Sequence, residues 1–140
     1  MARRRTLVHA VSVLALALGI RSAARVRDWR SADVFYAAAT RDTPNAYRAW
    51  FVRAMHEKTT GRSAEAEASL RHALALWPRV PVVYEELGQL LRANGRCEEA
   101  IPIFREGLAL DTARTQLRAK LTECEKWGQM RADRATSISR

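Results

Sequence analysis

The chain has 140 residues and a formal net charge of +9, which is high for a domain of this size. Residues 1–30 hold seven Lys and Arg against one acidic residue, whereas residues 31–127 hold fourteen against thirteen. A nucleic-acid-binding domain gathers its basic residues on the folded surface that tracks phosphates, and here they flank a nearly neutral centre instead. The sequence therefore predicts one folded domain with no nucleic-acid partner.

The most apolar stretch runs without a charge from Thr6 to Ile20, and arginines flank it on both sides. A helix of this length spans roughly 22 Å, which is short of the roughly 30 Å hydrocarbon core of a bilayer. Flanking arginines reach the headgroups and a bilayer thins locally, so we expect membrane contact through this segment. Residues 1–29 are assigned to a basic and apolar N-terminal anchor or signal-like segment, which places the protein at a membrane (single-pass) or makes it exported.

Two alternatives for the same segment stay open. A basic start followed by an apolar run also fits a cleaved secretory signal, and apolar runs of similar length are often buried helices of a soluble domain. Because arginines lie on both sides, the sequence also leaves open which side of the membrane the rest of the chain occupies.

The middle of the chain repeats itself with a period of 34 residues. In each unit apolar residues recur at helical spacing, a glycine separates two such runs, and a proline closes the preceding unit. Each unit is therefore predicted as helix, turn and helix, over about residues 47–80 and 81–114. The six matching pairs are Pro44 and Pro78, Trp50 and Tyr84, Gly61 and Gly95, Ala66 and Ala100, Leu70 and Phe104, and Leu76 and Leu110.

This pattern resembles the tetratricopeptide repeat (TPR), which places a large aromatic, Leu-Gly, a turn glycine, Ala, an aromatic, Ala and Pro at fixed positions. The resemblance covers roughly residues 30–127. It implies an all-α fold, a short α-solenoid of antiparallel helix pairs, here preceded by an apolar N-terminal helix. In the first unit Arg53-Ala54 replaces Leu-Gly. The predicted packing residues are Trp50, Gly61, Ala66, Leu70, Ala73 and Pro78 in the first unit, and Tyr84, Leu87, Gly88, Gly95, Ala100 and Phe104 in the second, where Leu91 also fits the pattern.

Shorter elements flank the two units and are expected to complete the core, since two repeats alone bury too little surface. Residues 30–46 fit a half-repeat with one helix from Ser31 to Arg41. Residues 115–127 fit a capping helix with an apolar stripe at Leu117, Leu121 and Cys124. Residues 128–140 are predicted to be a disordered basic tail.

The resemblance also implies where a partner binds, because the first helix of each TPR unit lines a concave groove. The mixture of apolar and charged side chains expected there suits an extended peptide or a partner helix. Recognition of a chaperone tail is not expected, because Phe51 and Met55 stand where the family uses Lys and Asn for it. The predicted partner-binding residues are Arg48, Phe51, Val52, Met55 and Lys58 in the first unit, and Val82, Glu85, Glu86, Gln89 and Arg92 in the second.

Chemically reactive residues are few and scattered. Cys97 and Cys124 fit either a disulfide, if the repeats face an oxidising compartment, or two buried thiols, and the sequence favours the thiols. His9, His56 and His72 show no metal-ligand spacing, and no phosphate-binding loop or nucleophile motif is present. We therefore expect no enzyme activity, catalytic residue, metal, cofactor or small-molecule substrate.

The sequence thus predicts a non-catalytic protein–protein interaction scaffold, anchored at a membrane, that binds a peptide or partner helix. Two alternatives remain. An arginine-flanked apolar helix leading into these repeats weakly resembles the C-terminal end of multi-span membrane glycosyltransferases that carry TPR tails, which would make the chain an auxiliary or truncated part of such a system. A purely cytosolic TPR adaptor, whose first helix is part of the core, is the other.

Overall fold

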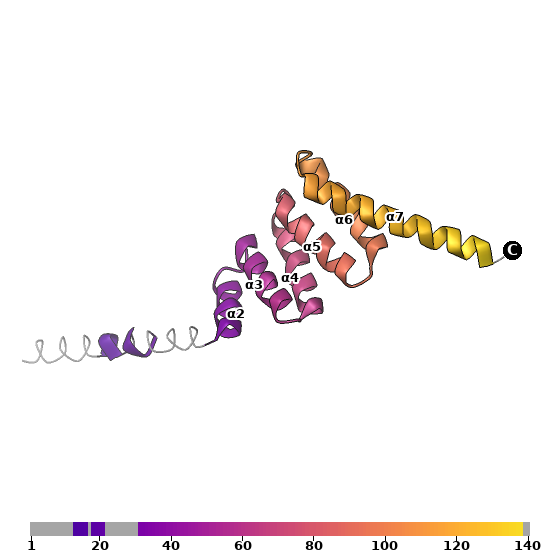
Figure 1. The fold of residues 1–140 in the computed structure, drawn as a ribbon. Coiled ribbons are helices and arrows are strands. Elements are labelled where there is room, and N and C mark those ends of the chain that lie inside the picture. Colours follow the sequence, from indigo (N-terminus) through magenta and orange to yellow (C-terminus); the bar gives the residue numbers. More distant parts are fainter. Residues whose placement is uncertain (1–12, 17, 22–30, 139–140) are drawn as a thin grey trace, which may run out of the picture.

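The computed structural model describes residues 13–16, 18–21 and 31–138, and this part of the chain is helical. Six helices follow one another in a row, each packed against the next (Figure 1). The predicted all-α solenoid of helix pairs is confirmed. The helices are α2 (Ala32–Asp42), α3 (Tyr47–Thr59), α4 (Ser63–Leu76), α5 (Pro81–Ala93), α6 (Cys97–Leu110) and α7 (Thr115–Ile138).

The predicted apolar segment from Thr6 to Ile20 lies partly outside the described residues. Residues 13–16 and 18–21 are helical, and the five large apolar side chains among them are 59% to 68% exposed. In the part of the chain that the structure describes, no helix combines the length and the apolar character needed to cross a membrane.

The turns between α3 and α4 and between α5 and α6 have the same geometry. Gly61 and Gly95 adopt φ angles of +78° and +76°, a region that glycine enters without steric cost. In both turns the amide of the residue after the glycine donates to the carbonyl five residues earlier, at 2.9 Å. This bond closes the preceding helix as in a Schellman motif. The predicted turn glycines are therefore placed where the backbone requires them.

Each helix pair is also fixed to the loop before it by an aromatic side chain. The Trp50 indole Nε1 donates to the Pro44 carbonyl at 2.8 Å, and the Tyr84 hydroxyl donates to the Pro78 carbonyl at 3.0 Å. Trp50 is half-buried and Tyr84 is buried. The 34-residue period of the sequence is thus a period of hydrogen bonds as well as of apolar residues.

The core runs between the helix pairs and continues onto α7. At Gly88 the ring of Phe104 occupies the space where another residue would have its Cβ, so α5 and α6 approach closely. The loop residues Gly61, Gly95 and Pro78 are exposed. Apart from Trp50 and Tyr84, described above, the other predicted packing residues are fully buried or nearly so, namely Ala66, Leu70, Ala73, Leu87, Gly88, Ala100 and Phe104.

The interior of α3 differs from that of α5. Glu57 is 1% exposed, and its carboxylate accepts from Arg53 Nε at 2.6 Å and from Ser69 Oγ at 2.7 Å. The pair α3 and α4 packs as extensively as α5 and α6, with Ala54 fully buried. The replacement of Leu-Gly by Arg53-Ala54 therefore leaves the two helices closely packed.

A disulfide between Cys97 and Cys124 joins the start of α6 to the middle of α7, with the two Cα atoms 5.1 Å apart. This corrects the preference for two buried thiols. The short connection between α6 and α7 makes them antiparallel, and that places the first residue of α6 beside Cys124. Leu117 and Cys124 are fully buried, so the predicted stripe of the capping helix faces the core.

Helix α7 continues beyond the predicted cap. It reaches Ile138, where the sequence predicted a disordered tail from residue 128 onward. The residues that follow Trp127 include no proline and several good helix formers, so that nothing local stops the helix. An ion pair between Arg131 and Glu98 at 3.7 Å also links this extension to α6.

Candidate protein-binding face

Alternate helices of the row share one face. Lys58 Nζ of α3 lies 2.6 Å from Glu86 Oε2 of α5, and Arg92 of α5 lies 3.3 Å from Glu123 of α7. These ion pairs show that side chains of α3, α5 and α7 reach one another across the surface. We call this surface the α3–α5–α7 face; it comprises Arg48, Phe51, Val52, Met55, Lys58, Val82, Glu85, Glu86, Gln89 and Arg92 together with Lys120, Glu123, Lys126 and Trp127 of α7.

Glu85 lies at the centre of this face and is 12% exposed at its side chain. It pairs with Arg114 at 2.8 Å and with Lys120 at 2.9 Å. Burial raises the pKa of Glu85, but the hydrogen bonds and charges of Lys120 and Arg114 outweigh burial and hold its pKa below the usual range. The carboxylate is therefore ionised at neutral pH and ties α5 to α7.

The α3 side of the face is apolar. Phe51 and Met55 are half-buried and pack against the core, whereas Val52 is 44% exposed. Val82 of α5 is half-buried and packs against the same core, and Arg48 is exposed at the start of α3. A ligand on this side meets aliphatic and aromatic surface.

The α5 side of the face is polar. Glu86 is held by Lys58, and Gln89 donates to Glu85 at 3.4 Å. Arg92 is exposed at the end of α5 and is held by Glu123. The ten predicted residues lie on α3 and α5, which share this face. Of their charged side chains, Lys58 pairs with Glu86, whereas Glu85 and Arg92 pair with residues outside the predicted set.

The contribution of α7 to this face was not predicted from the sequence. Residues 115–127 were expected to form a capping helix, because the repeat motif fails there. The 34-residue offset was nevertheless informative, since it aligns Gln89 with Glu123 and Arg92 with Lys126. Lys120, Glu123, Lys126 and Trp127 therefore extend the face by one helix.

A second polar cluster joins α2 to the helices that follow. The Asp33 carboxylate is hydrogen-bonded to His56 Nε2 at 2.8 Å and accepts from the Arg62 guanidinium. The hydrogen bonds of His56 and Arg62 hold the pKa of Asp33 below its usual range. Ser31 caps α2 by accepting from the Val34 amide at 3.3 Å. This cluster fixes the orientation of α2.

The remaining histidine of the repeats has a packing role, because the His72 ring lies 4.0 Å from the Trp50 ring, centroid to centroid. Among residues 13–16, 18–21 and 31–138, no group of three or more His, Cys, Asp or Glu is arranged to hold a metal ion.

No protein-family model matches the chain, and no curated protein matches it. Solved structures do. The TPR domain of Arabidopsis OM64 is similar with a TM-score of 0.64 at 20% identity, over 76% of this chain and 88% of that domain. The first TPR domain of Spaghetti (RPAP3), bound to the HSP90 peptide SRMEEVD, gives a TM-score of 0.61 at 21% identity, over 65% of this chain and 74% of that one.

A third similar structure is that of MamA, with a TM-score of 0.59 at 14% identity over 66% of this chain. The chain spans about half the length of MamA, 54% of it. At these identities the likeness concerns the fold, and it agrees with the repeated glycine turns and aromatic hydrogen bonds described above. The chain has the fold of tetratricopeptide-repeat domains.

Proposed function

We propose that this chain is a non-catalytic scaffold that binds a segment of a partner protein on the α3–α5–α7 face. The observation that carries the proposal is the composition of that face. Half-buried apolar side chains of α3 lie beside a row of charged side chains on α5 and α7. Protein segments are recognised by this combination, because apolar anchors supply affinity and flanking polar contacts fix the register.

The pairing of the charges supports a protein segment rather than a small ligand. Lys58–Glu86 and Arg92–Glu123 hold the charged side chains in fixed positions along about two helix diameters of surface. A preorganised row of this length costs little additional ordering on binding. One solved neighbour of the same fold holds a peptide, which adds support by analogy.

The proposal is tested by selecting binders from a library of random peptides and measuring their affinity for variants. Val52→Asp replaces an exposed apolar side chain and is expected to weaken the selected peptides at least about tenfold. Arg71→Ala on α4, where Arg71 pairs with Glu67, is the matched control and should change affinity less than about twofold. Peptides that bind equally to Val52→Asp, or a library that yields none, would count against the proposal.

The compartment is part of the same proposal. A disulfide between Cys97 and Cys124 is typical of proteins in an oxidising environment, so we place the repeats there. Contact of Thr6 to Ile20 with a membrane is proposed from the exposed apolar side chains described in that segment. Fractionation followed by an alkaline carbonate wash tests the contact. Protein absent from the membrane fraction before the wash would exclude the contact, and protein recovered wholly in the wash would exclude an inserted anchor.

A further inference from the structure

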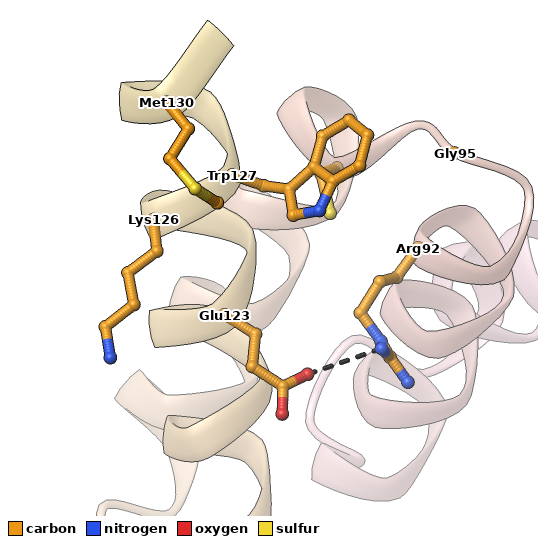
Figure 2. Close-up of a pocket in the computed structure, with 7 residues that line it drawn as sticks. Arg92, Gly95, Glu123, Lys126, Trp127 and Met130 are labelled. Carbon is orange, nitrogen blue, oxygen red and sulfur yellow. Dashed lines mark hydrogen bonds and ion pairs between the residues drawn. The ribbon is translucent and has the colours of Figure 1, made fainter.

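Two hollows lie beside Trp127, and of the residues that line them only Arg92 was predicted from the sequence to bind a partner. The first has a volume of about 430 Å³ and lies between α7 and the turn from α5 to α6. Figure 2 shows Trp127 projecting from α7 towards the loop that carries Gly95, with Arg92 and Glu123 joined across the gap between the helices. The second hollow, of about 200 Å³, is lined by Trp127, Met130, Arg131 and Arg134.

Both hollows share two large apolar lining residues, Trp127 and Met130. Trp127 is 54% exposed and Met130 is 57% exposed, although each has a large apolar surface. The first hollow reaches the lower size range of pockets that hold a ligand or an anchoring side chain. Cys97 lines it as well, so its disulfide to Cys124 fixes the α6 wall against α7. The site is therefore held in shape without a ligand.

The two hollows are spaced by one helical turn. The first is lined on α7 by Glu123, Lys126, Trp127 and Met130, and the second by residues four positions further along. Four residues correspond to a rise of about 6 Å, which is also the separation of side chains at i and i+4 on a helix. A partner helix lying along α7 would place one side chain in each hollow.

The rim of the hollows is basic. Four basic side chains line them, against one carboxylate, Glu123, which Arg92 already holds. Arg131 forms an ion pair with Glu98 at 3.7 Å, whereas Lys126 and Arg134 form no ion pair within the described part of the chain. A partner that brings carboxylates to this rim gains charge complementarity.

We infer that α7 docks an amphipathic helix of a partner protein that carries two large apolar side chains at i and i+4, flanked by Asp or Glu. This inference rests on the proposed function, since it names the kind of segment bound at the α7 end of the α3–α5–α7 face. The apolar side chains enter the two hollows beside Trp127, and the acidic side chains pair with Lys126 and Arg134.

Other occupants of this surface fit less well. A second copy of the chain would set its own Lys126, Arg131 and Arg134 against the same residues, and like charges face to face oppose a symmetric interface. An anionic lipid surface would satisfy the charges, but apolar membrane contact needs side chains that protrude, and here the apolar surface is hollowed.

The test uses the full chain with its disulfide formed and a designed helical peptide of about 18 residues, or five turns. The peptide carries Leu and Phe at i and i+4 with Glu on both flanks, and a second peptide has Lys in place of every Glu. Fluorescence polarisation should give a Kd of about 1 to 30 µM for the Glu peptide and at least about tenfold weaker binding for the Lys peptide.

Two variants connect this binding to the hollows. Trp127→Ala and the double change Lys126→Glu with Arg134→Glu should each weaken the Glu peptide at least about tenfold. Trp77→Ala removes another exposed tryptophan, 57% exposed between α4 and α5, and should leave binding within about twofold. Circular dichroism melting of each variant checks that the helices are retained.

Several outcomes would overturn the inference. They are no preference for the Glu peptide, equal binding by Trp127→Ala, a Trp127-dependent dimer in sedimentation velocity, or Trp127-dependent binding to vesicles with 30% anionic lipid without peptide binding. If library peptides still depend on Val52 while Trp127→Ala has no effect, only this inference fails. If both substitutions leave all peptides bound, the proposed function fails too.

Discussion

The two helix pairs of the repeat, α3–α4 and α5–α6, have the same turns and the same aromatic hydrogen bonds but different interiors. In α5–α6 the ring of Phe104 packs directly on the backbone at Gly88, and Leu87 and Leu91 are fully buried. In α3–α4 the positions equivalent to those two leucines hold Arg53 and Glu57. The equivalent positions are therefore filled by apolar side chains in α5–α6 and by a buried carboxylate with its hydrogen-bond partners in α3–α4.

The substitutions between the units come in compensating pairs. Ala54 stands where the second unit has Gly88, and the residue opposite is Leu70 instead of the larger Phe104. Both Ala54 and Leu70 are fully buried. A larger side chain on one helix is accompanied by a smaller one on the other, so the distance between the helices is preserved. The two units therefore keep the same packed volume and helix geometry, and individual residue types are exchangeable within those limits.

The largest expected effect comes from Gly88→Ala in the apolar unit. The added Cβ would lie within 3 Å of three ring carbons of Phe104, so α5 and α6 must separate. We expect a loss of about 3 kcal/mol in the free energy of unfolding, measured by urea denaturation. Adding Phe104→Leu copies the Ala54 and Leu70 pair of the other unit and should recover part of the loss.

Gly128→Ala in α7 is the control for this experiment, because nothing lies within 4 Å of a Cβ at that position. It should stabilise the chain by about 0.5 kcal/mol through helix propensity. If Gly88→Ala behaves like Gly128→Ala, the close packing of α5 on α6 is not what distinguishes the two units.

An intermediate effect is expected from the polar unit. Glu57→Ala removes the acceptor of both Arg53 and Ser69 and should lower the free energy of unfolding by about 2 kcal/mol. The loss is smaller than for breaking a fully buried ion pair, because Arg53 is partly solvated. Replacing Arg53 and Glu57 together by leucine copies the second unit. That double variant should be at least as stable as the wild type in thermal denaturation, and a double variant less stable than Glu57→Ala would show that the polar interior is required.

The smallest expected effect is a pH-dependent contribution of Glu85 to stability. Glu85 of α5 aligns with Phe51 of α3, so this acid-sensitive link exists only in the second unit. Because its folded pKa lies below its unfolded value, the carboxylate stabilises the fold above about pH 4.5, and the stabilisation disappears as the pH falls through the folded pKa. Glu85→Gln should cost about 1 kcal/mol at pH 7 and less near about pH 3.5 by urea denaturation. A cost that is equal at both pH values would exclude a charge effect.

Much of the fold is readable from local pattern. Gly61 and Gly95 predict the turns, because only glycine enters their φ region without steric cost. The proline before each unit indicates the end of the preceding helix. The half-repeat helix predicted from Ser31 to Arg41 is found as α2, Ala32–Asp42, with Ser31 as its N-cap. The ten predicted binding residues recur at helical spacing within each unit, and they lie on α3 and α5, which share one face.

The features that the sequence did not predict all depend on what meets after the helices have packed. Glu57 is hydrophilic by type, and its burial becomes favourable only because Arg53 and Ser69 donate hydrogen bonds to its carboxylate. Cys97 and Cys124 are brought together by the antiparallel packing of α6 and α7. The hollows beside Trp127 exist because α7 continues past the predicted cap, which composition alone did not indicate.

Binding of a protein segment on the α3–α5–α7 face can be mapped residue by residue by NMR titration. A peptide selected from the library is added to ¹⁵N-labelled chain, and the shifts of backbone amides are followed to saturation. We expect the largest shifts on α3, α5 and α7, around Val52, Gln89 and Lys126. Shifts confined to α4 and α6, with these three residues unperturbed, would contradict it.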